Sequence, residues 1–233
     1  MKLHIIRHGE PDYARDCLTP LGQTQAMAIL DLPWINGVKR IYSSPLGRAV
    51  DTAEAVARGV RLPARVLPWL REMDEVVVWD ERRPDLAVWN LDPERLRGLE
   101  EKHWLNSGPF SGTPLAGRWD SLREGADKIM AEYAVVRRES GWRTLAEESA
   151  DEAEIAIFCH LGVGLTLIAY LLEVCPLTLW RSAFLAPASV TTLLLERRAG
   201  GRAGFRLLRL GDISHLIKNN IEAGTAGLQY NTK

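Results

Sequence analysis

Four short stretches of this 233-residue chain carry residue types that could act together on a phosphate group. The first is an Arg-His-Gly triplet at positions 7–9, and the other three supply Arg48, Glu72 and His160. The guanidinium of arginine is a planar fork of donors that suits phosphate oxygens, and a histidine can be a neutral nucleophile near pH 7. A carboxylic acid can protonate a leaving oxygen. The combination therefore indicates phosphoryl transfer, in which the arginines neutralise the phosphoryl oxygens.

Each of these residues follows a segment that the sequence predicts to be a strand. Residues 3–6 are an apolar run long enough for a short buried strand and too short for a helix. Further strands are predicted at 39–43 and 154–159, with a weaker one at 65–67. Because the carboxyl ends of parallel strands share one edge of a sheet, where open α/β sheets bind ligands, we expect the side chains to converge there. The expected site consists of Arg7, His8, Arg48, Glu72 and His160.

Helical patterns alternate with these strands. Thr19 and Pro20 have the residue types of an N-cap and of a first helical position. The predicted helices are 19–31, 44–59 and 161–174, and the predicted later strands are 189–196 and 204–210. This alternation predicts a single α/β domain over residues 1–233, namely a three-layer, doubly wound, mostly parallel sheet with helices on both faces. The helix starts near residues 44 and 160 would add backbone N–H donors to the site.

The middle of the chain, residues 75–142, differs in composition from the two ends. It is rich in tryptophan and charged residues, and it predicts helices at about 92–105 and 119–139. No Gly/Ser-rich linker flanks it, so we interpret it as a helical insertion, or cap, over the carboxyl edge of the sheet. Most of its tryptophans are expected to pack the insertion against the core. Trp79 is a candidate pocket residue because it closely follows Glu72 in sequence.

Charge and cysteine content limit the partners. The formal net charge is −1, which gives no reason to expect nucleic acid or an anionic membrane as a partner. The three cysteines form neither a disulfide framework nor a metal-binding spacing. The constellation of arginines, histidines and a carboxylate suits phosphoryl transfer without a metal, and no cofactor is expected. The start of the chain lacks a long apolar signal region, and the apolar run near residues 163–172 is too short to span a bilayer. We therefore expect a cytoplasmic enzyme that acts on a small phosphorylated metabolite.

Blocks at both ends of the chain resemble one known family. The first is Ile-Ile-Arg-His-Gly-Glu at 5–10, and the second-histidine block is Phe-Cys-His-Leu-Gly at 158–162. The other matching blocks are 18–26, 41–53, 188–191 and 212–216. In this order, they resemble the histidine phosphatase superfamily, the phosphoglycerate mutase-like enzymes. The middle of the chain does not take part in the resemblance.

The resemblance implies a role for each site residue. His8 would become a phosphohistidine, while Arg7, Arg48 and His160 would bind the phosphoryl group. Glu72 matches the family's proton donor. The family commonly continues with a Trp-Glu-Gly triplet, which is absent here, so Glu75 is an alternative proton donor.

The function that follows is a metal-independent phosphatase for a small phosphomonoester. Two alternatives remain open. One is phosphoglycerate mutase-type transfer, although residues 10–18 lack the Ser-x-x-Asn stretch of the family's mutases. The other is a catalytically silent protein that binds a phosphorylated ligand. The sequence also leaves open a homodimer and does not name the substrate.

Overall fold

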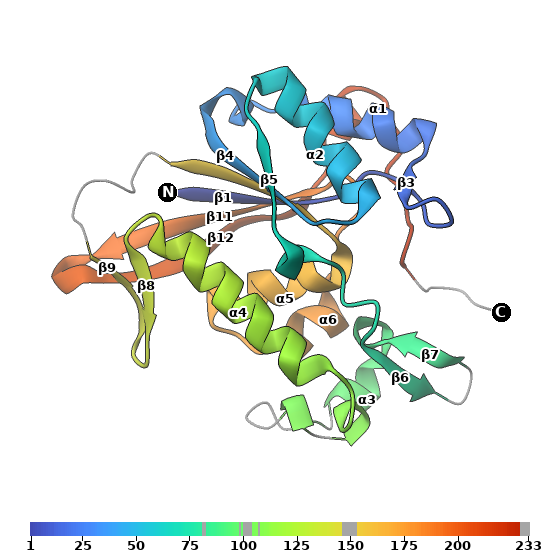
Figure 1. Cartoon of the computed structure of the whole chain (residues 1–233), viewed down its shortest axis with the longest axis vertical. Coiled ribbons are helices and arrows are strands. Elements are labelled where there is room, and N and C mark those ends of the chain that lie inside the picture. The colour runs from blue at the N-terminus through green and yellow to red at the C-terminus, as the bar shows by residue number, and fades with distance from the viewer. Residues whose placement is uncertain (81–82, 98, 100–103, 107, 146–152, 229–233) are drawn as a thin grey trace.

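The computed structural model has a central eight-stranded sheet with helices on both faces (Figure 1). It describes residues 1–80, 83–97, 99, 104–106, 108–145 and 153–228. The strand order is β5-β4-β10-β1-β11-β12-β9-β8. In that order, the strands are Ala64–Val66, Val38–Ser43, Glu154–Cys159, Lys2–Arg7, Val190–Arg198, Arg202–Asp212, Gly141–Thr144 and Val135–Arg138. The predicted α/β fold is therefore confirmed.

The first four strands in this order are parallel, and the other four are antiparallel. In the central strand β1, Leu3, Ile5 and Ile6 are fully buried, as expected for a sheet that is covered on both faces. The carboxyl ends of β1, β4 and β10 lie at one edge, because Arg7 pairs with Cys159 and Phe158 with Ser43. This edge is the one at which the sequence places the site.

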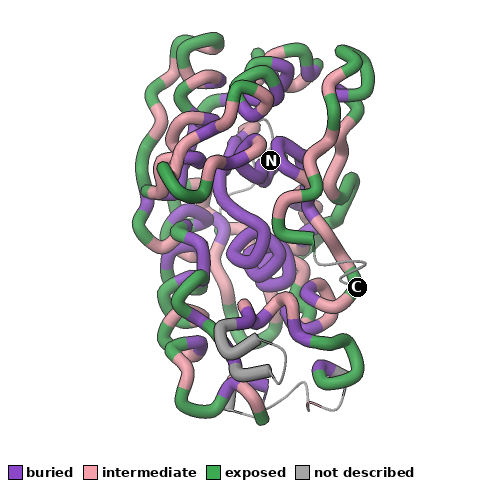
Figure 2. Tube along the Cα trace, turned by 90° about the vertical axis from the view of Figure 1, so that its right-hand side faces the viewer, coloured by how far each residue is buried: buried purple, intermediate pink, exposed green. Residues whose placement is uncertain are grey.

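Two helical layers cover the sheet (Figure 1). On one face, α1 (Pro20–Ala28) and α2 (Gly47–Val60) enclose a core with Ile29, Ala53 and Val56. On the other face lie α4 (Leu115–Ala131), α5 (Leu161–Leu172) and α6 (Pro176–Ser182). Figure 2 shows the buried segments gathered in the centre of the molecule. The described residues also form two short helices, α3 (Pro93–Arg97) and α7 (Ser214–Lys218). No helix within the described ranges is long and apolar enough to cross a bilayer.

The middle segment, residues 75–142, is predicted to be a helical insertion, but it contains strands as well as helices. It begins with a hairpin of β6 (Val77–Asp80) and β7 (Arg83–Ala87). The helix predicted over 119–139 begins earlier, at Leu115, and ends at Ala131. The chain then turns at Ala134, which has a φ of 56°, and enters β8 and β9, which extend the central sheet. The β-branched pair at 135–136 favours a strand over a helix.

The helix predicted over 92–105 is also shorter than expected. Only α3 is helical there, with a 3-10 turn at Trp104–Asn106, and residues 98 and 100–103 lie outside the described part. Tryptophans of this segment do pack inward: Trp142 is fully buried, and Trp104 contacts the rings of Trp119 and Trp180 edge to face. The side chain of Trp79 lies outside the described residues, so its predicted pocket role stays a prediction.

His4 in β1 gives a prediction about stability. Its ring stacks on Trp34 at 3.6 Å between centroids, and Nδ1 lies 3.1 Å from Thr192 Oγ1. Burial, with Lys2 and Arg209 nearby, lowers its pKa from 6.5 to about 3. As the pH falls below 6.5, His4 binds a proton in the unfolded chain but not in the folded protein. The contribution of His4 to the unfolding free energy, which is fully present above pH 6.5, is therefore progressively lost. We expect His4→Gln to reduce the pH slope of the unfolding free energy by about 1.4 kcal/mol per pH unit below 6.5. Urea unfolding at pH 7 and pH 5 tests this. An equal change in unfolding free energy between the two pH values in the wild type and the variant would contradict it.

Candidate active site

His8 lies immediately after β1 and is fixed through its backbone. Its N–H donates to the carbonyl of Cys159 at 3.0 Å, and its carbonyl accepts from Ala188 N–H at 2.9 Å. The next residue must be glycine, because a Cβ at Gly9 would lie 2.5 Å from the carbonyl oxygen of Gly22 in α1. The triplet of the first block is therefore held between β10, the turn before β11 and the first helix.

The imidazole of His8 is arranged as a nucleophile. Its Nδ1 lies 2.7 Å from the carbonyl oxygen of Gly9, which can only accept, so Nδ1 carries the hydrogen and Nε2 carries the lone pair. Burial, followed by the charge of Arg7, lowers the pKa of His8 well below 6.5. The ring is therefore neutral near pH 7, and its Nε2 is available for attack.

His160 faces His8 from the end of β10. The two ring centroids are 5.1 Å apart. Nε2 of His160 lies 2.6 Å from Ser44 Oγ, which also accepts from Leu46 N–H at 3.2 Å. We assign the Ser44 hydroxyl hydrogen to the bond with Nε2, and this assignment places the His160 hydrogen on Nδ1. Burial, followed by the charges of His8, Arg48 and Arg7, lowers the pKa of His160 well below 6.5, so this ring is also neutral.

Arg7 is almost completely buried beside the two histidines. Its Nη1 and Nη2 donate to the carbonyl oxygens of Leu185 and Ala226, both at 2.7 Å. The ring of Phe184 lies 5.6 Å from the guanidinium carbon. Its Nε is buried and has no hydrogen-bond partner among the described residues. Arg7 thus presents a free N–H while its position is fixed by two backbone carbonyls.

Arg48 approaches the site from the first turn of α2. Its guanidinium forms an ion pair with Asp16 and lies 5.3 Å from the ring centroid of Tyr13. The same Asp16 carboxylate accepts from Gly47 N–H at 2.7 Å. Tyr13 also meets the ring of His8 edge to face at 6.5 Å. The loop between β2 (Pro11–Asp12) and β3 (Cys17–Leu18) therefore closes over Arg48.

Glu72 lies in the same buried region and joins it to α5. Its carboxylate accepts three backbone N–H groups: Met73 at 3.0 Å, Gly162 at 3.0 Å and Val163 at 2.8 Å. Burial raises the pKa of Glu72, against the opposing effect of these hydrogen bonds and of Arg7. The raised pKa favours the acid form that a proton donor needs.

Glu75, the alternative proton donor, is placed differently. Its side chain is 41% exposed and forms an ion pair with Arg118 at 2.8 Å. The helix N-termini also differ from expectation: the first N–H groups of α5 donate to Glu72, and Gly47 N–H of α2 donates to Asp16. These three N–H groups bind carboxylates of the chain itself, so they are not free to bind a ligand.

Three buried nitrogens around His8 have no hydrogen-bond partner in the described part of the chain. They are Nε of Arg7, Nε of Arg48 and Nδ1 of His160. Both arginines lower the pKa of both histidines, which reflects their proximity. Buried donors are nearly always satisfied, so their gathering around a neutral imidazole fits a small oxyanion such as a phosphoryl group. No group of three or more metal-ligating side chains is found within the described ranges.

We compared the chain with known protein families. Residues 3–206 match the histidine phosphatase superfamily, branch 1. The chain belongs to this superfamily. A relative named probable phosphoglycerate mutase GpmB from Proteus mirabilis is 26% identical over 228 residues, which cover 93% of this chain and 95% of that protein. A protein of the same name from Cronobacter sakazakii is 32% identical over 230 residues, with the same coverage.

Solved structures share the fold of this chain. A mycobacterial glucosyl-3-phosphoglycerate phosphatase is 25% identical, with a TM-score of 0.60 over 90% of this chain and 98% of that one. A phosphoserine phosphatase from Entamoeba histolytica, in complex with 3-phosphoglyceric acid, is 22% identical with a TM-score of 0.59, over 92% and 98% of the two chains. The sequence relatives are thus named as mutases, and these structures as phosphatases.

The candidate site contains residues that the sequence did not predict. Tyr13 and Asp16 flank Arg48, and Ser44 binds His160. Tyr13 and Asp16 belong to a polar loop whose conformation no periodic pattern predicts. Ser44 does follow a predicted strand, so its position at the carboxyl edge was the one available signal.

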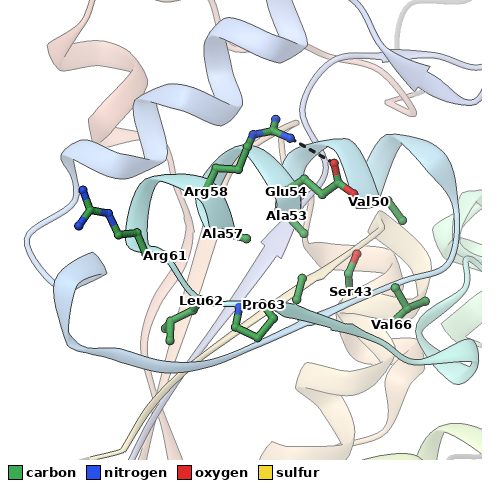
Figure 3. A pocket seen from close by; sticks show the side chains of 11 residues that line it. Ser43, Val50, Ala53, Glu54, Ala57, Arg58, Arg61, Leu62, Pro63 and Val66 are labelled. Carbon is green, nitrogen blue, oxygen red and sulfur yellow. Dashed lines mark hydrogen bonds and ion pairs between the residues drawn. The ribbon is translucent and has the colours of Figure 1, made fainter.

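A separate hollow lies between α2 and β5 (Figure 3). Its volume is about 340 Å³, and Glu54 and Arg58 form an ion pair at its side. Its described lining residues include none of the five predicted site residues. This hollow is therefore not the site of the expected chemistry.

Proposed function

We propose that this protein is a metal-independent phosphatase that hydrolyses a small phosphomonoester through a phosphohistidine on His8. The observation that supports the proposal most strongly is the set of three buried nitrogens around the neutral imidazole of His8 that have no hydrogen-bond partner among the described residues. Two guanidinium groups supply the positive charge that neutralises the phosphoryl oxygens. No cofactor is required by this mechanism.

In the first step, Nε2 of His8 forms a bond to phosphorus while the bond from phosphorus to the ester oxygen breaks. The leaving oxygen takes the proton of the Glu72 carboxylic acid and departs as an alcohol. The phosphohistidine ring gains positive charge, and its Nδ1–H continues to donate to the carbonyl of Gly9. Arg7, Arg48 and His160 hold the three phosphoryl oxygens throughout.

In the second step, water gives one proton to the Glu72 carboxylate as its oxygen forms a bond to phosphorus. The bond between phosphorus and Nε2 of His8 breaks at the same time. Inorganic phosphate leaves, while His8 is neutral again and Glu72 is again an acid. One carboxyl group thus serves as acid and then as base.

A mutase is the second candidate, supported by the name that the curated relatives carry. In that case a hydroxyl group of a second acceptor molecule takes the place of water in the second step. The residues assigned above would keep their roles. The two activities differ only in the fate of the phosphoryl group.

Rapid mixing with ³²P-labelled metabolite phosphates, including 3-phosphoglycerate, tests the proposal. We expect an alkali-stable, acid-labile phosphoenzyme, because phosphohistidine has this stability, and release of the label as inorganic phosphate. Predominant transfer of the label to phosphoglycerate would favour the mutase. Tight binding of phosphate esters with neither phosphoenzyme nor turnover would contradict both activities and support a silent ligand-binding protein.

A further inference from the structure

We call the predicted site residues Arg7, His8, Arg48, Glu72 and His160 the buried cluster. A cavity of about 330 Å³ lies beside this cluster, between α5, α6 and the 3-10 turn Val88–Asn90. We call it the side cavity. Its volume is at the low end of the range for small-molecule sites, about 300–1,000 Å³, and is sufficient for one ring with substituents. Most of its walls are apolar or aromatic; the residues used below are Trp89, Leu161, Trp180, Arg181, Ser182 and Phe184.

The side cavity borders the residues that would bind phosphate. Leu161 in its wall directly follows His160, and the ring of Phe184 lies over Arg7. Gly227 forms another part of the wall: a Cβ there would lie 3.2 Å from Arg7 Nη2 and 3.4 Å from Leu161 Cδ2. Phe184 and Gly227 therefore adjoin both the side cavity and the guanidinium of Arg7, which is not itself among the described lining residues.

The side cavity also lies on the Glu72 side of the cluster. Glu72 accepts from the N–H of Gly162, and a Cβ on Gly162 would lie 2.4 Å from the ring of Trp89. Glu72 is the group that would protonate the leaving oxygen. The alcohol part of a bound ester must therefore extend from this side, towards the wall that Trp89 forms.

The charge at the cavity indicates a second group on the ligand. Arg181, at the end of α6, lines the cavity and has no ion pair or hydrogen bond to any described residue. No acidic side chain is among the described residues of the lining. An arginine of this kind is suited to a carboxylate, and the walls formed by Trp180 and Phe184 are suited to an aromatic ring.

We propose that the side cavity binds the alcohol part of the substrate, and that the preferred substrates are phosphomonoesters of an alcohol that carries an aromatic ring and a carboxylate. This inference rests on the proposed phosphatase function and narrows its substrate class. The aromatic ring packs on Trp180 and Phe184, while the carboxylate pairs with Arg181.

Three esters with the same primary-alcohol leaving oxygen test the inference: ethyl phosphate, 2-phenylethyl phosphate and 2-(4-carboxyphenyl)ethyl phosphate. In the wild type we expect kcat/KM to rise about tenfold or more from the first to the second, because a ring is buried. A further rise is expected for the third. Calorimetry with the corresponding non-hydrolysable phosphonates measures the same preferences without turnover.

Two variants assign these preferences to the cavity. Ser182→Trp, from an exposed position at the cavity mouth, should bring the phenylethyl-to-ethyl ratio close to one. Arg181→Gln should remove the gain from the carboxylate while keeping the gain from the ring. Arg123→Gln on α4 is the matched control, since Arg123 lines a different surface hollow, and it should preserve both ratios.

The outcomes separate the inference from the proposed function. Equal kcat/KM for the three esters, or variant ratios equal to those of the wild type, would overturn the substrate class while hydrolysis itself still supports a phosphatase. Failure to hydrolyse any ester would overturn the proposed function. The ratios for the phosphonates would then decide separately whether the cavity binds a carboxylated ring.

Discussion

The His8→Asn variant is expected to form no phosphoenzyme and to lose on the order of 10³-fold or more in kcat. The change removes the lone pair of Nε2, and none of the other groups in the cluster is placed to replace it. His160 is neutral too, but its Nε2 is engaged with Ser44 and its Nδ1 is assigned as a donor. Stopped-time labelling with a ³²P ester, together with steady-state release of phosphate, measures both effects.

His4→Gln is the matched control for this experiment. His4 is as buried as His8 and lies in β1, the strand that His8 directly follows, but it contacts Trp34 and Thr192 rather than the site. It should change stability and preserve the phosphoenzyme. If His8→Asn formed as much phosphoenzyme as the wild type, another residue would be the nucleophile and the mechanism would be wrong.

The second large effect is expected for Glu72→Gln, and it should depend on the leaving group. Alkyl esters need a proton on the departing oxygen, so their kcat should fall about 10²- to 10⁴-fold. Nitrophenyl phosphate releases a stable anion that needs no proton, so the first step with this ester should change little. Because glutamine leaves Gly162 N–H without its carboxylate acceptor, unfolding should be measured in parallel to separate loss of the acid from loss of folded protein.

The pH profile gives the same experiment a second readout. Burial raises the pKa of Glu72, so the acid form persists to higher pH than for an ordinary glutamate, and alkyl ester hydrolysis should decline above that pKa. This limb should disappear in Glu72→Gln. Glu75→Gln is the control: Glu75 is paired with Arg118 near the surface, and the limb should remain. Loss of the limb in the Glu75 variant instead would transfer the acid role to Glu75.

The elements at both ends of the chain could be predicted because their signals are local. A short apolar run that stops at polar residues predicts β1 and β10, and a threonine before a proline predicts the start of α1, where Thr19 accepts from Gly22 N–H at 3.1 Å. The meeting of residues 7, 8, 48, 72 and 160 followed from the rule that parallel strands end at a shared edge. These predictions needed no knowledge of side-chain contacts.

The middle of the chain could not be predicted in the same way. A helical pattern runs through residues 119–131, but its apparent continuation becomes a turn at Tyr133 and then β8, which contains Val136, because β9 and β12 offer a sheet edge to pair with. Such pairing is a tertiary effect that overrides local propensity. The roles of Tyr13, Asp16 and Ala226 near the arginines likewise depend on how loops fold back, which no periodicity encodes.

The position of β1 has a consequence for how this protein is made. Lys2 in β1 and Glu154 in β10 are paired although 152 positions separate them, and the other neighbour of β1 is β11, which comes later still. On the ribosome the first strand therefore emerges long before either partner exists. The apolar side chains of β1 therefore stay exposed until β10 and β11 are translated. A nascent chain that ends before β10 cannot yet hold His8 in place. The candidate site can therefore first assemble once β10 and β11 have been translated.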